Sequence, residues 1–428
     1  MYRPNNKKKP SIKEQAIWNA ASGFLCALET VIMEMVASHY LNLNNVGELT
    51  IAFALGNLFR TIGLWGTKTY HLSDLKYEFS FSDYQKNRLL NMTLMMLAVF
   101  AYVLYLIFAR GTTIHKITVI VIIEIVFLIE CYEDLVWGEY QRRGRLDIGA
   151  KLFIIRWGSI LVSYSIIVYC FRSLIIALVG SLLISSSIFF AVLIFYYGIP
   201  KDFKMKDNGR NLFLTLEQKR LFKLTFPLFL ISFLTFFLNN MAKYSLDYYY
   251  SEEIQAYFGF ISLSMFVVEM LSAFVYQPTL TKISRLWIEN EKKELLLEIL
   301  RQISFILIIL LVCLSAGWFL GIPVLSVLFS ANLTQYKYDL MLNILAGGVM
   351  AFVMYACAVL TIMRKQKLQL FILGVIDTLG GIIIWNMVKR FGVRGCSVGN
   401  LMVYALQAIV MYIVMLCVFF KGEKVNKN

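Results

Sequence analysis

Long apolar stretches separated by short charged connections run through the whole chain and restrict the folds that it can adopt. Hydrophobic residues make up 59% of the 428 residues and charged residues only 16%, whereas a soluble domain is about 45–50% apolar. Each apolar stretch is long enough to cross a bilayer as one helix, so we predict an all-α polytopic membrane protein with about 12 transmembrane helices. The predicted spans are 16–40, 46–68, 86–109, 113–138, 148–170, 174–197, 221–244, 254–276, 297–320, 340–363, 369–388 and 392–420.

The basic residues concentrate on one side of this predicted layout. With the N-terminus placed in the cytoplasm, 31 of the 41 Lys and Arg residues fall in the inner segments, counted together with the inner ends of the adjoining spans. Cytoplasmic connections of membrane proteins carry an excess of Lys and Arg, so we expect both termini to be cytoplasmic. The net charge of +14 then reflects connections beside anionic lipid, and we expect no nucleic-acid partner.

The two halves of the chain resemble each other in the spacing of their connections. In each half the connection after the second span is long and charged (69–85 and 277–296), and the connection after the fourth is short and basic. We therefore predict two six-helix bundles around a central cavity, as in alternating-access carriers. The predicted division is an N-terminal bundle at 1–200, a cytoplasmic linker at 201–220 and a C-terminal bundle at 221–428.

Five charged residues from five spans share one predicted depth. Each lies about eight residues from the inner end of its span, which is roughly 12 Å at 1.5 Å per residue. Charges inside a membrane usually face the bundle interior or water, so we expect a charged layer in an inward-opening cavity. Its members are Arg60, Glu130, Arg156, Glu269 and Asp377.

Two functions for this layer remain open. Arg60 and Arg156 offer paired donors that match phosphate geometry, and we name both as candidate substrate contacts together with Asn57. The other interpretation is ion pairing between helices, for example between Glu130 and Arg156, and we favour it for Glu130. Glu269 and Asp377 are candidates for ion coupling or ion pairing.

Three carboxylates lie deeper in the predicted spans: Glu29, Glu34 and Glu124. A buried carboxylate can carry a proton for coupled transport. The alternative, which we favour slightly, is that these residues balance Arg60 or bind backbone groups.

The sequence gives little support for a metal site, a cofactor or catalysis. The seven cysteines form no CxxC pair and His is limited to three residues, so we expect no metal centre. Hydrolase, metalloprotease, Walker A and dinucleotide-binding motifs do not occur in a suitable context, and we expect neither a cofactor nor enzymatic activity.

The first apolar segment contains Glu29 and Glu34 and has no A-x-A cleavage site, which predicts a retained helix and not a signal peptide. The run Tyr248–Tyr250 could stack on sugar rings, although an interfacial aromatic belt is the preferred interpretation.

Two stretches carry a family resemblance. Residues 63–88 read GLWGTKTYHLSDLKYEFSFSDYQKNR, and residues 139–156 read EYQRRGRLDIGAKLFIIR. Both resemble inner connections of bacterial polysaccharide repeat-unit flippases, members of the multidrug/oligosaccharidyl-lipid/polysaccharide exporter superfamily. The matching positions are Tyr70, Ser73, Asp74, Phe81, Ser82, Asp83 and Tyr84 in the first stretch, and Gln141, Gly144, Arg145, Leu146 and Asp147 in the second. The resemblance covers the first half well, whereas His39, Asn42 and His71 depart from the family pattern.

The resemblance implies a function. A flippase of this kind would move an undecaprenyl-pyrophosphate-linked oligosaccharide from the inner to the outer leaflet of the bacterial plasma membrane, for capsule or exopolysaccharide synthesis. Its partners would be this lipid-linked substrate, membrane lipid and other polysaccharide assembly proteins. The alternatives are an ion-coupled drug exporter of the same fold and, less favoured, a membrane polysaccharide polymerase or acyltransferase.

Overall fold

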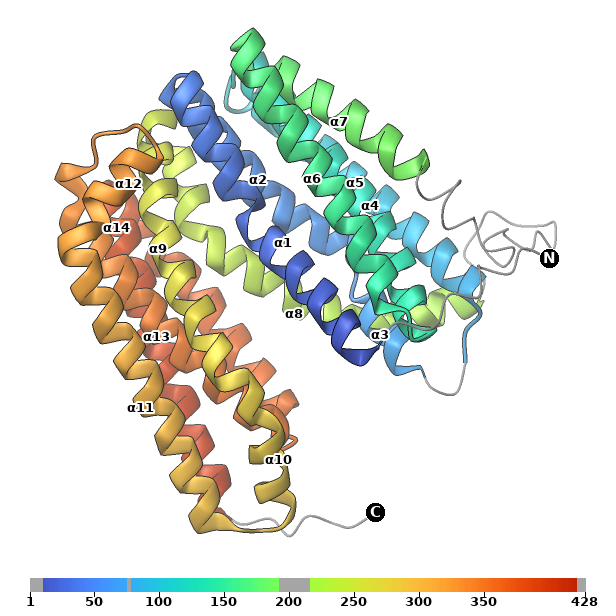
Figure 1. The fold of residues 1–428 in the computed structure, drawn as a ribbon, viewed down its shortest axis with the longest axis vertical. Helices are drawn as coiled ribbons and strands as arrows, with labels where there is room; N and C mark the ends of the chain where they lie inside the picture. Colours follow the sequence, from blue (N-terminus) through green and yellow to red (C-terminus); the bar gives the residue numbers. More distant parts are fainter. Residues whose placement is uncertain (1–10, 75–77, 192–215, 422–428) are drawn as a thin grey trace. The chain divides into compact units, whose positions relative to one another are not determined.

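The computed structural model describes residues 11–74, 78–191 and 216–421, and the regular structure in these ranges is helical throughout. The first seven helices are α1 (Ile12–Tyr40), α2 (Leu43–Leu64), α3 (Thr67–Ser73), α4 (Phe81–Phe108), α5 (Ile114–Arg142), α6 (Leu146–Phe171) and α7 (Leu174–Ala191). They are followed by α8 (Leu216–Tyr249), α9 (Glu252–Tyr276), α10 (Leu280–Ile288), α11 (Lys292–Ala316), α12 (Ile322–Leu328), α13 (Lys337–Ile362) and α14 (Gln366–Lys421) (Figure 1).

Nine of the described helices are long and apolar enough to cross a membrane, or ten if the bent pair α2 and α3 is counted as one span. Helix α5 is not among them although it has 29 residues, because acidic residues interrupt its apolar sequence. With α5 included, one more span is needed to reach the predicted twelve. It comes from α14, whose 56 residues contain a break at Gly392 (φ 55°, ψ −131°). Each predicted span therefore corresponds to a helix or to one limb of α14.

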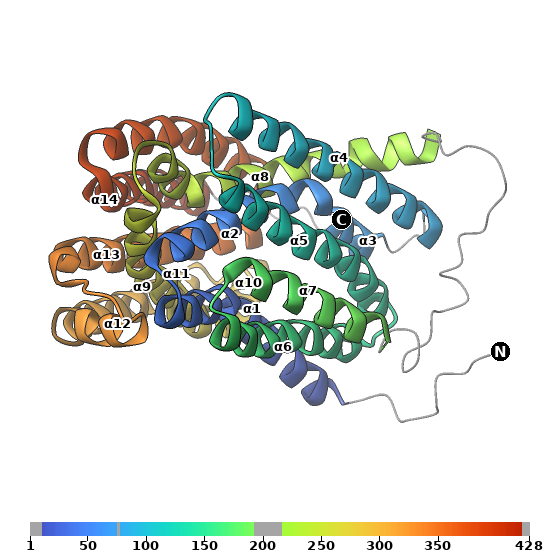
Figure 2. The same ribbon diagram turned by 90° about the horizontal axis from the view of Figure 1, so that it is seen from above.

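The break at Gly392 folds α14 into a hairpin. Gly380 lies against Val403 and Gly399 against Ile384, which is the pairing that two antiparallel limbs produce. Figure 2 shows the two limbs running next to each other. A residue with φ near +55° is unfavourable for most side chains but not for glycine, so this position turns one long apolar segment into two spans.

The connection after the fourth span has the same backbone in both halves. In the first half the N–H of Gly144 binds the carbonyl of Gln141 (3.0 Å) and that of Arg145 binds Tyr140 (2.9 Å). In the second half Arg364 binds Thr361 and Lys365 binds Leu360, both at 3.0 Å. These bonds define a Schellman motif, and its central residue has positive φ in each case (71° and 58°). The short basic connections noted in the sequence are thus one structural element used twice.

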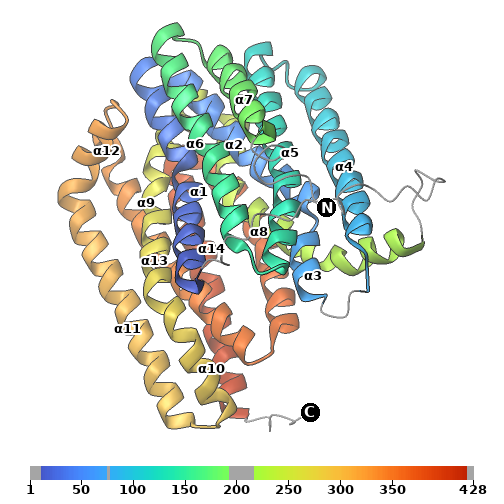
Figure 3. The same ribbon diagram turned by 45° about the vertical axis from the view of Figure 1, so that its right-hand side comes forward.

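The longer connections repeat as well. The first contains α3 (Thr67–Ser73) and the second contains α10 (Leu280–Ile288), where the sequence had indicated only charged connections. In the second half, α10 and α12 lie at opposite ends of α11 (Figure 3).

Contacts divide the chain into two compact units, Met1–Phe236 and Phe237–Asn428. In the first unit α1 and α7 pack against α6, and α2 and α6 pack against α5; in the second, α9 and α14 pack against α13. The boundary lies inside α8, whose first part stays with the first unit. Most of the predicted linker 201–220 lies outside the described residues, and the predicted domain bounds stay a prediction.

Two glycines bring α2 close to α5. A Cβ at Gly56 would overlap the Phe127 ring, and one at Gly63 would come within 2.6 Å of the Cys131 sulfur. Small residues at such positions let helix backbones approach each other inside a membrane. Because Arg60 lies between the two glycines on α2, this approach brings its side chain to α5.

A methyl group at Gly56 tests this close approach. We expect Gly56→Ala to destabilise the protein by about 1–3 kcal/mol, because the Phe127 ring has to move. The measurement is thermal unfolding of the purified protein in detergent. Gly23→Ala is the matched control, since a Cβ there meets nothing within 4 Å. A Gly56→Ala variant as stable as Gly23→Ala would contradict the argument.

Candidate functional site

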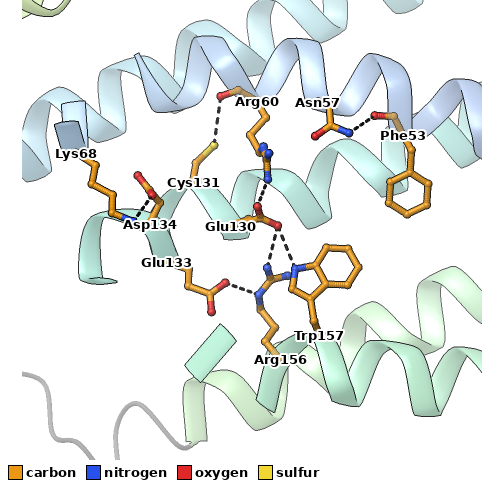
Figure 4. A network of polar contacts seen from close by, with 10 residues as sticks. All are labelled: Phe53, Asn57, Arg60, Lys68, Glu130, Cys131, Glu133, Asp134, Arg156 and Trp157. Atoms are coloured by element: carbon orange, nitrogen blue, oxygen red, sulfur yellow. Dashed lines mark hydrogen bonds and ion pairs between the residues drawn. The ribbon is translucent and has the colours of Figure 1, made fainter. Parts of the chain in front are cut away.

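Glu130 on α5 binds two guanidinium groups that come from two other helices (Figure 4). One carboxylate oxygen accepts from Arg60 of α2. The other accepts from Arg156 Nη2 at 3.0 Å and from the Trp157 indole N–H at 3.2 Å, both on α6. This single carboxylate therefore joins α2, α5 and α6 inside the first unit.

The two arginines differ in their surroundings. Arg156 is 1% exposed, and its Nε donates to Glu133 Oε2 at 2.6 Å while its Nη2 binds Glu130. The Arg60 side chain is 16% exposed, and its buried Nε has no hydrogen-bond partner among the described residues. Asn57, one turn earlier on α2, is also partly exposed and donates to the Phe53 carbonyl at 3.0 Å. Asn57 and Arg60 thus share the part of α2 that its neighbours leave open.

The structure brings together three of the five residues predicted to share one layer. Arg60 and Arg156 each bind Glu130, so the suggested pair of Glu130 with Arg156 is present. Glu269 and Asp377 belong to the second unit. Asp377 accepts from Gln407 Nε2 at 2.6 Å, whereas Glu269 is half-buried and has no hydrogen bond or ion pair within the described ranges.

A second buried ion-pair cluster was not predicted from the sequence. Asp134, next to Glu133 on α5, binds Lys68 Nζ at 3.1 Å and Arg88 Nη2 at 2.9 Å. Arg88 is fully buried and also donates to the Gly63 carbonyl at 3.1 Å. Adjacent residues on a helix point about 100° apart, so Glu133 faces α6 while Asp134 faces α3 and α4. In the sequence this cluster was indicated by the pair of adjacent acids, Glu133 and Asp134. Depth along the helix does not show that their side chains face different helices.

The deeper carboxylates have different environments. Glu34 is buried and accepts from the Thr50 hydroxyl at 2.7 Å. Glu124 is 0% exposed, and neither of its oxygens has a hydrogen-bond partner in the described part of the chain. Glu29 is buried within electrostatic range of Glu130, Glu133, Arg60 and Arg156. Glu29, Glu130 and Glu133 outnumber Arg60 and Arg156 by one, whereas the adjacent cluster of Asp134 with Lys68 and Arg88 has one cation more than it has acids.

Residues of the first family-like stretch build the connection between α3 and α4. The Asp74 carboxylate accepts from the backbone N–H groups of Glu78 (3.0 Å) and Phe79 (3.3 Å) and from the Tyr84 hydroxyl (3.0 Å). Burial alone would raise the pKa of Asp74, but these donors and the nearby charge of Arg142 hold it below its usual range. Asp74 is therefore ionised at neutral pH and fixes the local fold.

Three further motif residues, Asp83, Arg145 and Asp147, are structural too. Ser80 and Asp83 form a capping box at the start of α4, which satisfies free backbone donors there. After α5, Arg145 binds the Asp147 carboxylate through two nitrogens at 2.9 and 3.1 Å. The residues that carry the family resemblance thus stabilise connections and do not line the Glu130 network.

The Glu130 network can be tested by removing its central charge. We expect Glu130→Gln to reduce stability by about 3–5 kcal/mol, because Arg60 and Arg156 lose a shared counter-charge in a buried site. Thermal melting of the purified protein measures this change. The matched control is Glu269→Gln, which removes a membrane carboxylate without a partner and should leave the melting temperature equal or higher. Equal melting of Glu130→Gln and the parent protein would show that the network does not stabilise the unit.

The chain resembles proteins of known structure in its fold. No protein-family model and no curated protein sequence matches the chain, but solved structures do. An inward-facing multidrug resistance MATE family transporter of the MOP superfamily is similar over 92% of this chain and 95% of its own, with 15% identity and a TM-score of 0.68. The lipid II flippase MurJ in an inward closed conformation is similar over 95% of this chain and 89% of its own, with 12% identity and a TM-score of 0.70. A MOP superfamily transporter from Pyrococcus furiosus gives 15% identity, a TM-score of 0.57 and 96% coverage of both chains.

This chain has the fold of MOP superfamily transporters. The predicted all-α polytopic membrane protein with about twelve spans in two bundles is confirmed. The multi-pass membrane location is confirmed as well, while the cytoplasmic position of the termini stays a prediction. These neighbours are transporters and a flippase, not enzymes. Both a multidrug resistance transporter and a lipid II flippase have this fold, so the fold by itself does not indicate what this chain binds.

Proposed function

We propose that the protein is an alternating-access flippase for a polyprenyl-pyrophosphate-linked oligosaccharide in a bacterial plasma membrane. The observation that carries this proposal is Arg60, a guanidinium in a membrane-spanning helix that keeps a partly exposed side chain and an unpartnered donor. Guanidinium groups bind phosphate through paired, charge-assisted hydrogen bonds. The family-like connections and the similarity in fold to a lipid II flippase support the same class of substrate.

The geometry suggests how Arg60 would bind a phosphate. In this structure its partner is Glu130, so an incoming phosphate would compete with that carboxylate, with Asn57 as an additional donor beside it. Glu130 would remain bound to Arg156 and Trp157. Arg156 is enclosed, and it would contact the substrate only after Glu130 moves. We therefore assign Arg60 and Asn57 to initial contact and Arg156 to a later contact or to positioning of Glu130.

Substitution of the arginines tests the flippase proposal. In a strain whose surface polysaccharide depends on this protein, we expect Arg60→Ala and Arg156→Ala each to lower surface polysaccharide about tenfold, since a hydrogen bond to a charged group contributes about 1.5–3 kcal/mol. Lipid-linked units should accumulate on the inner leaflet. Arg60→Lys should retain part of the activity. The control is Arg301→Ala, an exposed arginine on α11, and immunoblots of membranes establish equal protein levels. Unchanged polysaccharide in both alanine variants would refute the proposal.

We further propose that the surplus carboxyl, Glu29, couples transport to a proton gradient, with Glu34 and Glu124 as additional candidates. A proton on Glu29 would balance the three acids against Arg60 and Arg156, and its release would add a negative charge beside these two arginines. Such a change in charge alters which conformation the network favours. Glu34 already has the Thr50 hydroxyl as a partner. Glu124 takes no part in the contacts of Arg60 and Arg156.

A neutral isostere at Glu29 separates coupling from charge balance. We expect Glu29→Gln to keep the protein folded but to make transport insensitive to collapse of the proton gradient by an uncoupler, because the titrating group is gone. Transport is measured as above in cells treated with graded uncoupler. The control is Glu289→Gln, which removes an exposed carboxylate after α10 that is none of the three candidates and should remain sensitive. A Glu29→Gln variant with the sensitivity of the parent protein would exclude Glu29 as the coupling group.

A second candidate function is ion-coupled export of cationic drugs. Glu269 and Asp377 favour it, because both are membrane carboxylates of the second unit without a basic partner in the described residues. A similar MATE transporter is a multidrug resistance protein. Efflux of cationic dyes from vesicles that contain the purified protein, compared with Glu269→Gln and Asp377→Asn, would decide in favour of this function.

A further inference from the structure

Each unit carries an exposed cluster of aromatic rings and a cation at the end opposite to its Schellman turn. In the first unit the cluster is Tyr40, Tyr169 and Arg172. The Tyr40 and Tyr169 rings meet edge to face with centroids 5.5 Å apart, and the Arg172 guanidinium lies 5.9 Å from the Tyr40 ring. Tyr169 is 61% exposed, and Arg172 is exposed as well. We call this set the first aromatic–cation cluster.

The second unit has the same arrangement in Tyr248, Tyr249, Trp385 and Lys389, the second aromatic–cation cluster. The Trp385 ring lies 5.1 Å from Tyr248 and 5.3 Å from Tyr249, measured between centroids. The Lys389 ammonium lies 5.9 Å from the Tyr249 ring. Tyr248 is 45% exposed, and Lys389 is exposed as well.

The two clusters occupy equivalent positions in the repeated halves. Tyr40 is the last residue of α1, and Tyr249 is the last residue of α8. Tyr169 lies near the end of α6 and Trp385 near the end of the first limb of α14, and each of these helices follows one of the two matching Schellman turns. In both clusters the cation follows an aromatic residue by one helical turn: Arg172 follows Tyr169, and Lys389 follows Trp385. The arrangement therefore recurs with different residue types but the same chemistry.

The backbone holds these cations in defined places. Arg172 is the residue after α6 and has left-handed φ and ψ angles of 48° and 36°, a conformation that suits glycine better. Lys389 precedes the positive-φ residue Gly392, which packs against the Tyr250 ring.

The chemistry of the clusters fits an acidic sugar. The C–H groups on one face of a sugar ring carry weak positive charge and suit the negative face of an aromatic ring. A cation beside the ring can bind a carboxylate or phosphate on the same sugar. We propose that both aromatic–cation clusters are binding subsites for an acidic oligosaccharide. This inference rests on the proposed function and specifies its substrate: each cluster would bind the head group at the end of its own unit that is opposite to the Schellman turn.

An interfacial aromatic belt is the competing explanation, since Tyr and Trp are common at membrane surfaces. A belt requires only that each ring reaches the interface. A belt also accounts for a third group of this kind, Trp318 and Tyr338 with Lys337 Nζ 4.1 Å from the Trp318 ring. It does not predict that the first two clusters recur at equivalent helix ends of the two units. The two explanations differ in whether the rings bind a soluble sugar.

Binding of a soluble probe to the full chain in lipid nanodiscs tests the proposal. The probes are hyaluronan tetrasaccharide, which is acidic, and chitotetraose, which is neutral, and calorimetric titration measures their affinities. We expect the acidic probe to bind more tightly. Tyr169→Ala and Trp385→Ala should each weaken it about fivefold, the order of one aromatic contact. Tyr169→Phe and Trp385→Phe should retain binding, while Arg172→Gln and Lys389→Gln should remove the preference for the acidic probe.

The control is Phe108→Ala, which removes an exposed ring at the end of α4 that belongs to neither cluster. Absence of hyaluronan tetrasaccharide binding to the parent protein would overturn the proposal. Unchanged affinity of Tyr169→Ala and Trp385→Ala, with melting temperatures lowered as in Phe108→Ala, would identify the rings as membrane anchors and would also overturn it. Because binding is measured without transport, these results are independent of the polysaccharide assay with Arg60 and Arg156, on which the proposed function depends.

Discussion

The first unit depends on the sharing of one carboxylate, Glu130, between guanidinium groups from α2 and α6. A charge inside a bilayer is costly unless it has a partner and its hydrogen bonds are satisfied. Each member of this network is therefore tolerated only while the other helices stay in place. The glycines that bring α2 to α5 make the contact possible, and Glu133 of α5, which binds Arg156, and Trp157 of α6 complete it. A membrane protein has little hydrophobic driving force between its helices, so such contacts specify which helices are neighbours.

The same feature connects stability with the proposed transport. A phosphate that approaches Arg60 would compete for a group that already holds three helices together. Binding could then alter the packing of the unit without any long-range signal, because ligand and structural partner use the same donors. A surplus acid beside the pair adds a charge that can be neutralised by a proton. The proposed binding site and the proposed coupling site are thus parts of one electrostatic balance.

The sequence predicted the spans well because apolar length and helical rise determine them. It also placed Arg60, Glu130 and Arg156 at a common depth, since 1.5 Å per residue converts position into height. Depth does not give the direction in which a side chain points around the helix axis. The separate partners of Glu133 and Asp134 were therefore not predicted. Arg88 was overlooked because it lies near the start of a predicted span, where a charge usually reaches water. The clearest family-like residues, such as Asp74 and Gly144, stabilise connections, so a resemblance based on them indicates fold more directly than substrate.

The charges of α5 also have a consequence for how the protein is made. An acidic residue in the middle of a span costs about 2.5–3.5 kcal/mol on insertion scales, and α5 contains Glu124, Glu130, Glu133 and Asp134. Arg60 precedes its partner Glu130 by 70 residues, which a ribosome needs about 4–14 s to add at 5–20 residues per second. During that interval α2 has an unpaired cation, and α5 then enters with acids that the earlier helices can neutralise. We therefore expect insertion of α5 to be cooperative with helices already synthesised, because Arg60, Lys68 and Arg88, which precede it in the chain, supply partners for its acids.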